Sequence, residues 1–508
     1  MKNKITNNPL WSEGEDKNFG KVAVEYAAGQ DIVLDKKFVQ YECLVNQAHQ
    51  LMLLKQKILP ISQVKKILEV LEEIKKLDKK EGFELKKELE DVHSNVEQYV
   101  LNKLGIAVGG NLRLGIARND QVYTDTRMYI RDHILIINNQ LIDLITGLLS
   151  EADKYSGVIM PGYTHLRVSQ SITYGHWLTA KAYHFLDDLN NLVFAFEKVN
   201  KCPLGIFEMA GTQLSIDRKL TAEYLGFDGI TENSLYTANS RGEIEAKLLA
   251  DLSILALHIK RTMGEVILWS THEFGFLKIH DLYTTGGTAQ PNLKNPDTLE
   301  VIRANCAKVY GRFLETLITM DSLPSGFNRD TQQTKPALFE TINIFEETLP
   351  VFSGIMSSLT VNKEKMAKGA EINFANAPDV SVQIAVKGNV SFREAYKIVK
   401  TLIKEKYLKN SFSELTPKLL ATVSKKILDK KIFLTKSDLK KVSTPKDCVY
   451  NRISEGGPSP IQVKLMIKDI EKKVIGIKKE IINKQNVIKI AVHKLEESVK
   501  KTLNSAII

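Results

Sequence analysis

Two short polar segments place side chains that bind anions or move protons beside expected helix starts. In GIARNDQVYTDTRMYIRD, Arg118 and Asn119 stand just before a helical pattern, where free N–H groups and the helix dipole favour anions. A guanidinium there can hold a carboxylate through two hydrogen bonds. In MPGYTHLRVSQ, a Gly-Tyr turn presents Thr164 and His165 at the expected head of a helix, and histidine suits proton transfer near neutral pH. The alternative interpretations are a capped helix with a surface salt bridge and a structural histidine.

A third segment, TTGGTAQPNLKNPD at 284–297, is typical of a mobile Gly-rich loop that ends at an Asn-Pro-Asp helix start. Such loops often close over a substrate, and the tip of this one carries a single hydroxyl, that of Thr288. Beyond the loop lie Asn295 and Glu300. Glu300 could pair with a histidine and raise its basicity. Alternatively, it is an ordinary first-turn glutamate that interacts with the helix dipole.

A fourth segment, FNRDTQQTKPALFE at 327–340, separates Gln332 and Lys335 by three positions. If this part is helical, both side chains lie on one face and could hold a carboxylate or an amide. A solvated helix face is the alternative. No one of the four segments decides the function by itself.

Long helices must position these segments, and the sequence predicts an all-α fold. Apolar residues recur at helical spacing over 62–79, 124–152, 168–200, 241–276, 299–320, 339–361 and 461–508. The middle of the chain therefore supplies about five long helices, which indicates a bundle. After about residue 372 the helices shorten and lysine increases, so a small C-terminal domain is expected. The amphipathic stretch 461–508 predicts a helix used for packing or for oligomerisation.

Composition narrows the class of protein. The chain has 508 residues, 43% of them hydrophobic and 26% charged, which is enough for a large core. Its four cysteines form no CxxC pair, and no Cys/His cluster has zinc spacing, so reduced core thiols in a cytosolic protein are expected. No apolar stretch near the N-terminus predicts a signal peptide, and the most apolar helices fall short of a membrane span.

The formal net charge of +10 does not by itself indicate nucleic-acid binding. The lysines are spread along helical faces without aromatic interleaving or a DNA- or RNA-binding motif. A solvated surface with a mildly positive field, which attracts acidic metabolites, is the better interpretation. We therefore expect a cytoplasmic protein whose partners are a small-molecule substrate and copies of itself, and neither a nucleic acid nor a membrane.

Taken together and in this order, the segments resemble argininosuccinate lyases of the fumarase/aspartase superfamily. The resemblance runs from LWSEGEDKNFGKVAVEYAAGQDIVLDKKF near the start to VYNRISEGGPSPIQVKLMI near residue 474. It is carried by EDVHSNVE, ARNDQVYTDTRMYIRD, MPGYTHLRVSQ, VILWSTHEFGF, KNPDTLEVIR and DTQQTKPALF. These stretches are long and specific.

The resemblance implies a three-domain helical subunit in a homotetramer whose active sites each combine loops of three subunits. The implied domains are an N-terminal helical domain at 1–113, a central bundle at 114–372 and a small domain at 373–474, with an extra amphipathic helix at 475–508. The implied reaction belongs to arginine biosynthesis and splits argininosuccinate into arginine and fumarate without a metal or organic cofactor. A base removes a proton beside a carboxylate, cations and hydrogen bonds hold the carbanion, and an acid protonates the departing nitrogen.

The resemblance also implies roles for individual residues. His165 falls on the histidine of a proton relay, and Glu300 falls on its carboxylate partner. The positions implied to contact substrate are Asp35, Arg118, Asn119, Thr164, Lys294, Asn295, Gln332 and Lys335.

The sequence departs from the family pattern at several of its site positions. In the loop signature GSSxMPxKKNPD, Gly287 replaces the catalytic serine, Thr288 the second serine and Leu293 the first lysine. Phe207 and Glu208 stand where small residues are usual. Three interpretations stay open: a working lyase that recruits Thr288, a relative with altered chemistry on another amino-acid-derived substrate, and a non-catalytic subunit that binds a metabolite or a partner chain.

Overall fold

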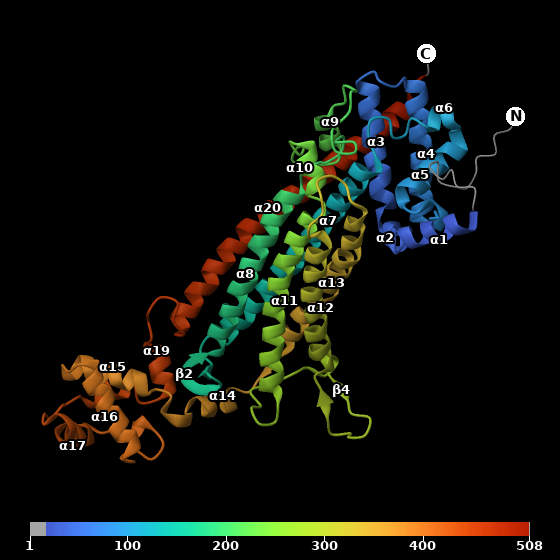
Figure 1. Cartoon of the computed structure of the whole chain (residues 1–508). Helices are drawn as coiled ribbons and strands as arrows, with labels where there is room; N and C mark the ends of the chain where they lie inside the picture. The colour runs from blue at the N-terminus through green and yellow to red at the C-terminus, as the bar shows by residue number, and fades with distance from the viewer. Residues whose placement is uncertain (1–16, 507–508) are drawn as a thin grey trace.

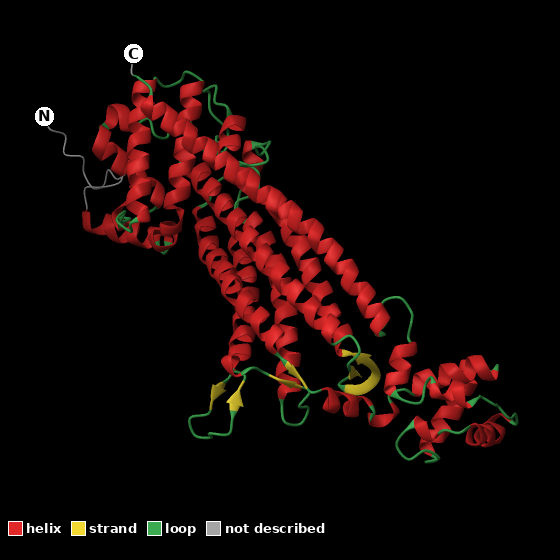
Figure 2. Ribbon diagram, turned by 180° about the vertical axis from the view of Figure 1, so that it is seen from behind, coloured by secondary structure: helices red, strands yellow, loops and turns green. Residues whose placement is uncertain are grey.

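The structure, a computed structural model, describes residues 17–506 as an elongated bundle of helices with a smaller group of helices at each end (Figure 1). Seen from behind, the chain is almost entirely helical, and its short strands gather at one end of the bundle (Figure 2). The predicted all-α class is confirmed. Residues 1–16, which hold most of the stretch that bears on a signal peptide, lie outside the described range.

Five long helices form the bundle, as predicted from apolar spacing. They are α7 (Arg118–Lys154), α8 (Tyr174–Val199), α11 (Glu243–Ser270), α12 (Asp297–Met320) and α13 (Thr334–Ser358). In α11, for example, Leu248, Leu252, Leu255 and Ile259 are buried at spacings of three and four residues, the repeat of one helix face. We call the end where α7 begins the head end and the end where it finishes the foot end.

Helix α7 is the core helix of the bundle. It packs against α8, α13, α3 and the C-terminal helix. Among the described helices it alone is long and apolar enough, by composition, to cross a bilayer, but 56% of its most apolar window is buried inside the molecule. That burial is what a central helix of a bundle requires.

The N-terminal helices cover the head end. They are α1 (Lys17–Ala28), α2 (Asp31–Leu34), α3 (Val39–Lys55), α4 (Ile61–Lys79), α5 (Val92–Leu104) and α6 (Ile106–Gly109), with 3-10 turns at Asp35–Phe38 and Lys87–Leu89. Two short helices, α9 (Arg218–Tyr224) and α10 (Ser234–Asn239), lie at the same end. One hydrophobic core runs from these N-terminal helices into the bundle. The division at residue 113 therefore stays a prediction.

Three two-stranded antiparallel sheets lie at the foot end. They pair β1 (Ile159–Thr164) with β2 (Arg167–Thr173), β3 (Leu277–Lys278) with β6 (Thr360–Val361), and β4 (Thr285–Gly286) with β5 (Lys294–Asn295). The helix predicted over 168–200 is wrong for its first six residues, because these pair with β1 and α8 begins only at Tyr174. Thr173 caps α8 by accepting a hydrogen bond from the His176 N–H, and this fixes the boundary.

The C-terminal group of helices has its own apolar core. Its helices are α15 (Ala377–Gly388), α16 (Phe392–Lys404), α17 (Pro417–Leu428), α18 (Lys436–Lys440) and α19 (Pro445–Asn451), with 3-10 turns at Ile372–Phe374 and Phe412–Glu414. Helix α14 (Lys363–Ala370) packs instead on β1 and β2, and its Met366 belongs to the bundle core. The domain bounds 373–474 stay a prediction. Two further 3-10 turns, Asp281–Tyr283 and Arg329–Gln333, belong to the bundle.

The last helix, α20 (Pro460–Asn504), returns from the foot end along α7 and α8 to the head end (Figure 1). Val474, Ile481, Leu495 and Val499 are buried in this packing. The predicted amphipathic packing helix over 461–508 is thus confirmed as far as residue 504. Its end reaches the N-terminal helices, where the Lys65 ammonium donates to the Ser505 carbonyl oxygen at 3.1 Å.

Candidate active site

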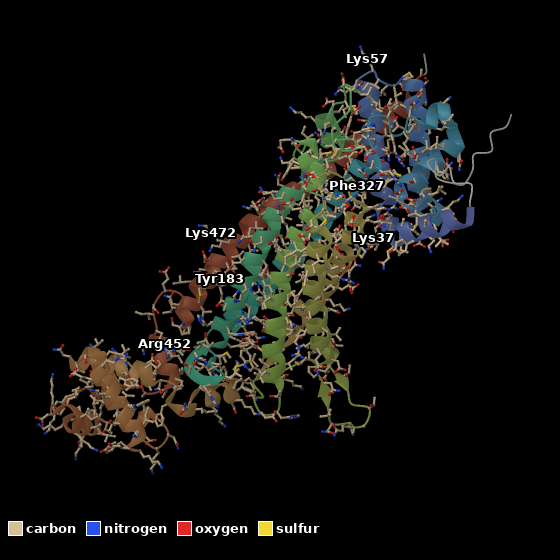
Figure 3. All side chains as sticks on the ribbon, in the orientation of Figure 1. Lys37, Lys57, Tyr183, Phe327, Arg452 and Lys472 are labelled. Carbon is tan, nitrogen blue, oxygen red and sulfur yellow. The ribbon has the colours of Figure 1, made fainter. Side chains whose placement is uncertain are left out.

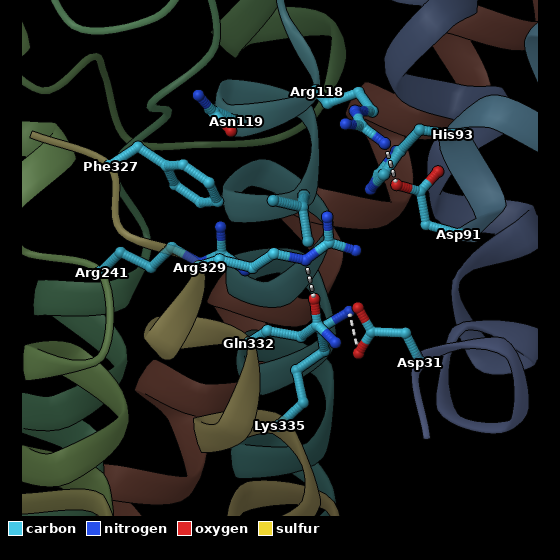
Figure 4. Close-up of a pocket in the computed structure, with 11 residues that line it drawn as sticks. Asp31, Asp91, His93, Arg118, Asn119, Arg241, Phe327, Arg329, Gln332 and Lys335 are labelled. Carbon is cyan, nitrogen blue, oxygen red and sulfur yellow. Dashed lines mark hydrogen bonds and ion pairs between the residues drawn. The ribbon is translucent and has the colours of Figure 1, made fainter. Parts of the chain in front are cut away.

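A polar cavity at the head end gathers four of the residues that the resemblance implies as substrate contacts (Figure 4). We call it the head pocket. It is lined by Asp31, Asp91, His93, Arg118, Asn119, Val122, Arg241, Phe327, Arg329, Gln332 and Lys335. The first turns of α7 and α13, together with the loops before α5, α11 and α13, supply most of this lining. Gln332 and Lys335 do share one side of the cavity, although Gln332 belongs to a 3-10 turn.

Lys335 anchors the floor of the head pocket. Its ammonium group is buried and lies 2.9 Å from Asp31 and 2.8 Å from Asp35. Burial alone would lower the pKa of Lys335, but the two carboxylates outweigh burial and raise it. Burial raises the pKa of Asp31 to about 6, although Lys335 opposes this shift. Asp35 is fully buried and does not line the pocket, so it reaches the cavity only through Lys335.

Arg118 enters the pocket from the first turn of α7. Its guanidinium lies 2.9 Å from the Asp91 carboxylate and 3.5 Å from Glu90. Asp91 is also the N-cap of α5, where it accepts a hydrogen bond from the Ser94 N–H. Burial alone would raise the pKa of Asp91, but the charges of His93 and Arg118 and the Ser94 N–H lower it to about 2. This carboxylate therefore stays ionised and orients the guanidinium.

Asp91→Asn is expected to lower the free energy of unfolding at pH 7 by about 2 kcal/mol. Asparagine caps a helix as well as aspartate, so the loss comes from the charge. Because the folded pKa of Asp91 lies below its ordinary value, its contribution is present above about pH 4 and is lost as the pH falls through about 2. Urea unfolding at several pH values measures the difference, and a difference that stays constant down to pH 2 would contradict the assignment. Exposed Asp153→Asn is the control.

Arg241 is a lining residue that the sequence interpretation missed. It is buried, its guanidinium carbon lies 5.0 Å above the centre of the Phe327 ring, and its Nη1 has no hydrogen-bond partner within residues 17–506. Burial lowers its pKa. A buried donor without a partner is costly unless an anion supplies the missing acceptor. The sequence gives one signal for Arg241 as a binding residue: it stands just before the start of α11, as Arg118 stands at the start of α7.

His93 lines the pocket from α5. It belongs to the motif EDVHSNVE, and the sequence assigned it no role of its own. Its Nδ1 lies 2.8 Å from the buried Glu42 carboxylate, while its Nε2 has no partner within residues 17–506. Asp125 lies 4.0 Å from the same Nδ1, and burial together with Glu42 raises its pKa strongly. These three side chains are close enough to hold a cation. Glu42, however, already accepts hydrogen bonds from Asn46 and Gln121, so we interpret the group as a support that orients His93.

The other implied site residues lie at the foot end. Thr164 ends β1, paired with Arg167, and His165 and Leu166 form the turn to β2, with φ values of 54° and 58°. The prediction that Thr164 and His165 stand at the head of a helix is therefore wrong, because this segment forms a β-hairpin. Thr288 is exposed in the connection between β4 and β5, and Glu300 lies in the first turn of α12. Within residues 17–506 the chain forms no hydrogen bond or ion pair between His165 and Glu300.

The β4–β5 hairpin shows why glycine stands at position 287. A Cβ atom there would lie 2.8 Å from the Gln290 carbonyl oxygen, closer than such atoms approach. The hairpin is held by a hydrogen bond from the Thr285 hydroxyl to Asp297 and by an ion pair of Lys294 with Asp281. A serine at 287 would force this turn to open, whereas Thr288 presents its hydroxyl without strain.

The two groups of site residues are too far apart to meet within one chain. Arg118 begins α7, and β1 starts five residues after α7 ends at Lys154. A helix of 37 residues is roughly 55 Å long. Phe327 near the head pocket and Arg452 near the β1–β2 hairpin mark the two ends in Figure 3. The chain by itself therefore divides the implied site residues into two separate groups.

Comparisons with known structures define the fold. The chain superimposes on an EDDS lyase in complex with formate with a TM-score of 0.83 at 23% identity, covering 93% of this chain and 95% of that one. It superimposes on a class II fumarase from Schistosoma mansoni with a TM-score of 0.67 at 14% identity, covering 82% and 91%. The fold is thus that of the fumarase/aspartase lyases.

Sequence comparisons place the chain within that class. The profile of the family described as Lyase matches residues 23–311. The chain is 35% identical over 454 residues to the argininosuccinate lyase of Bacillus cereus, covering 89% of this chain and 95% of that protein. It is 38% identical over 394 residues to that of Heliobacterium mobile, covering 78% and 85%. The chain belongs to the argininosuccinate lyase family.

Proposed function

We propose that this protein is a carbon–nitrogen lyase of arginine biosynthesis that cleaves argininosuccinate to fumarate and arginine by β-elimination, or cleaves a closely related N-succinyl compound to fumarate and the corresponding amine or guanidine. The observation that carries the proposal is the head pocket, in which a buried arginine with a free donor lies beside Arg118 and Lys335. Such cations bind the carboxylates of a dicarboxylate substrate. They stabilise even more strongly the extra negative charge of the carbanion that forms beside a carboxylate. The proposal requires no metal or organic cofactor.

Antiparallel copies of the chain complete the site in this proposal. A homotetramer in the cytoplasm would bring the β1–β2 turn of one subunit and the β4–β5 hairpin of another to the head pocket of a third. What supports this arrangement is the separation of the two groups of implied site residues by the length of α7. In an oligomer with closed symmetry every subunit has the same surroundings, so every head pocket receives the same segments from its neighbours.

The residues divide the reaction between them. Thr288, in place of a serine, first gives its hydroxyl proton to solvent water, and its alkoxide oxygen then takes the proton from the carbon beside the carboxylate, which regenerates the hydroxyl. Arg118, Arg241 and Lys335, with the Asn295 amide, hold the negative charge that this creates, and Lys294 joins them from the hairpin. The Asn119 amide nitrogen faces Glu208 and the Gln332 amide nitrogen donates to backbone carbonyl oxygens, so these two side chains shape the pocket. His165, polarised by Glu300 of a different subunit and placed beside Thr164, returns a proton to the departing nitrogen.

The test is the release of fumarate from argininosuccinate by the purified, assembled protein. Thr288→Val removes the hydroxyl at almost constant volume and is expected to lower kcat by about 10²- to 10⁴-fold. Thr288→Ser keeps a hydroxyl and is expected to retain most of the activity. Equal rates for Thr288→Val and the wild type would remove Thr288 from the mechanism. No fumarate from the assembled wild-type protein would overturn the proposed function.

A further inference from the structure

Glu208 stands at the rim of the head pocket, in the loop 203–212 where the family usually has small residues. Its carboxylate is exposed and accepts a hydrogen bond from the Nδ2 amide of Asn119, a residue that lines the pocket. The proposed function gives this carboxylate no role. A negative charge at the mouth of a pocket built for carboxylates calls for a physical explanation.

The position of Glu208 is fixed by the backbone around it. The Asp120 carboxylate, one residue after Asn119, accepts hydrogen bonds from the N–H groups of Gly205 and Phe207 at 2.9 Å each. Its other oxygen accepts the Ala117 N–H at 2.9 Å. The loop is therefore clamped to the first turn of α7, and Phe207 adopts a positive φ of 59° within it. The backbone at Glu208 is thus held beside Asn119, within reach of the hydrogen bond between the two side chains.

This contact decides which way the Asn119 amide faces. Because only its N–H groups can donate to a carboxylate, Nδ2 turns to Glu208. Figure 4 shows the nitrogen end of the amide turned outward and the oxygen end turned toward the other lining residues. Asn119 Oδ1 and the Glu208 carboxylate are both acceptors. The rim of the pocket therefore suits a group rich in N–H donors, whereas the arginines and Lys335 suit carboxylates.

We propose that Glu208 is a specificity-determining residue that binds the cationic nitrogen, ammonium or guanidinium, of the amino-acid half of the substrate. This inference rests on the proposed function and deepens it. The rim selects substrates whose leaving half is positively charged, and it disfavours N-succinyl compounds whose leaving half is neutral or acidic. A charge-assisted hydrogen bond supplies this preference, and a like charge would be repelled.

Binding of the two reaction products separates the two halves of the site. Isothermal titration calorimetry of the full-length protein with arginine and with fumarate is performed for the wild type, Glu208→Ala and Glu208→Gln. Both variants are expected to bind arginine about two- to fivefold more weakly, as for the loss of one exposed charged contact, and to bind fumarate unchanged. Glu471→Ala, which removes an exposed glutamate on α20, is the matched control and is expected to bind both products as the wild type does.

Three results would overturn the inference. They are unchanged arginine binding in Glu208→Ala, an equal weakening of arginine and fumarate in that variant, and a wild-type protein that does not bind arginine. The proposed function has a separate test: it fails if the wild-type protein releases no fumarate from argininosuccinate. Arginine binding that depends on Glu208 would support the rim assignment even in a protein that releases no fumarate.

Discussion

Mixing Arg118→Met subunits with His165→Ala subunits is expected to restore fumarate release that neither variant shows alone. Arg118→Met damages the head pocket, and His165→Ala damages the β1–β2 turn at the foot end. Each change removes a group that acts in the transition state, so each variant alone is expected to lose about 10²- to 10⁴-fold in kcat. If sites combine subunits, a head pocket from a His165→Ala chain can join a β1–β2 turn from an Arg118→Met chain.

At equal amounts of the two variants, half of the head pockets and half of the β1–β2 turns are intact. Random assembly therefore combines an intact pocket with an intact turn in roughly a quarter of the sites, and we expect about a quarter of wild-type activity. The variants are unfolded together, refolded and assayed. Refolding each variant alone is the first control, and refolding Arg118→Met with Lys335→Met, both defective in the head pocket, is the second. Recovery in the second control, or none in the mixture, would contradict sites shared between subunits.

Lys335→Met is expected to lower the free energy of unfolding by about 3–5 kcal/mol at pH 8. The substitution leaves Asp31 and Asp35 buried beside each other with no cation between them. The pKa of Asp31 is already raised to about 6 by burial, and loss of the lysine raises it further. A carboxylate with a raised folded pKa contributes stability at low pH that is lost as the pH rises through that pKa. The loss in the variant should therefore shrink as the pH falls toward 5.

Urea unfolding followed by circular dichroism at pH 5 and pH 8 measures this effect. Lys308→Met, at an exposed lysine 4.0 Å from Glu340, is the control and should change the stability little at either pH. Adding Asp31→Asn to Lys335→Met should recover part of the loss at pH 8, because it removes one of the two unpaired charges. A loss that is the same at both pH values would show that lost packing, and not the buried charge, dominates.

The long helices were predictable because each repeats a local pattern over many turns. The 461–508 stretch repeats apolar residues at near-helical spacing among lysines and glutamates, and α20 follows it to Asn504. The β1–β2 hairpin was not predictable in the same way. Its strands have six and seven residues, and the β1 strand contains both a proline and a glycine, which hide the alternation of a strand. The prediction therefore extended α8 backward through β2.

The site was predictable where motifs are local and not where distant segments meet. Arg118, Asn119, Gln332 and Lys335 all reach one cavity, as the resemblance implied. Arg241 lies in none of the quoted motifs, and Asp31 lies in one without an implied role; only packing brings them beside residues about a hundred or three hundred positions away. The resemblance did imply that the His165 turn and the Arg118 segment belong to loops that different subunits contribute, whereas the size of their separation follows from the length of α7.

The return of α20 to the head end also sets an order of events during synthesis. The Lys65 ammonium can donate to its carbonyl partner only after a residue 440 positions later has been made. Asp35 likewise gains its ion pair only after Lys335, 300 positions later, has been made. Such non-local contacts form late, after more local structure is in place. In a growing chain, Asp31 and Asp35 therefore stay without their cation until Lys335 has been made, and the N-terminal helices stay without α20 until nearly the whole protein has been made. A nascent chain stalled before residue 335 should show these helices open to proteases, and one stalled before α20 should show them only partly protected.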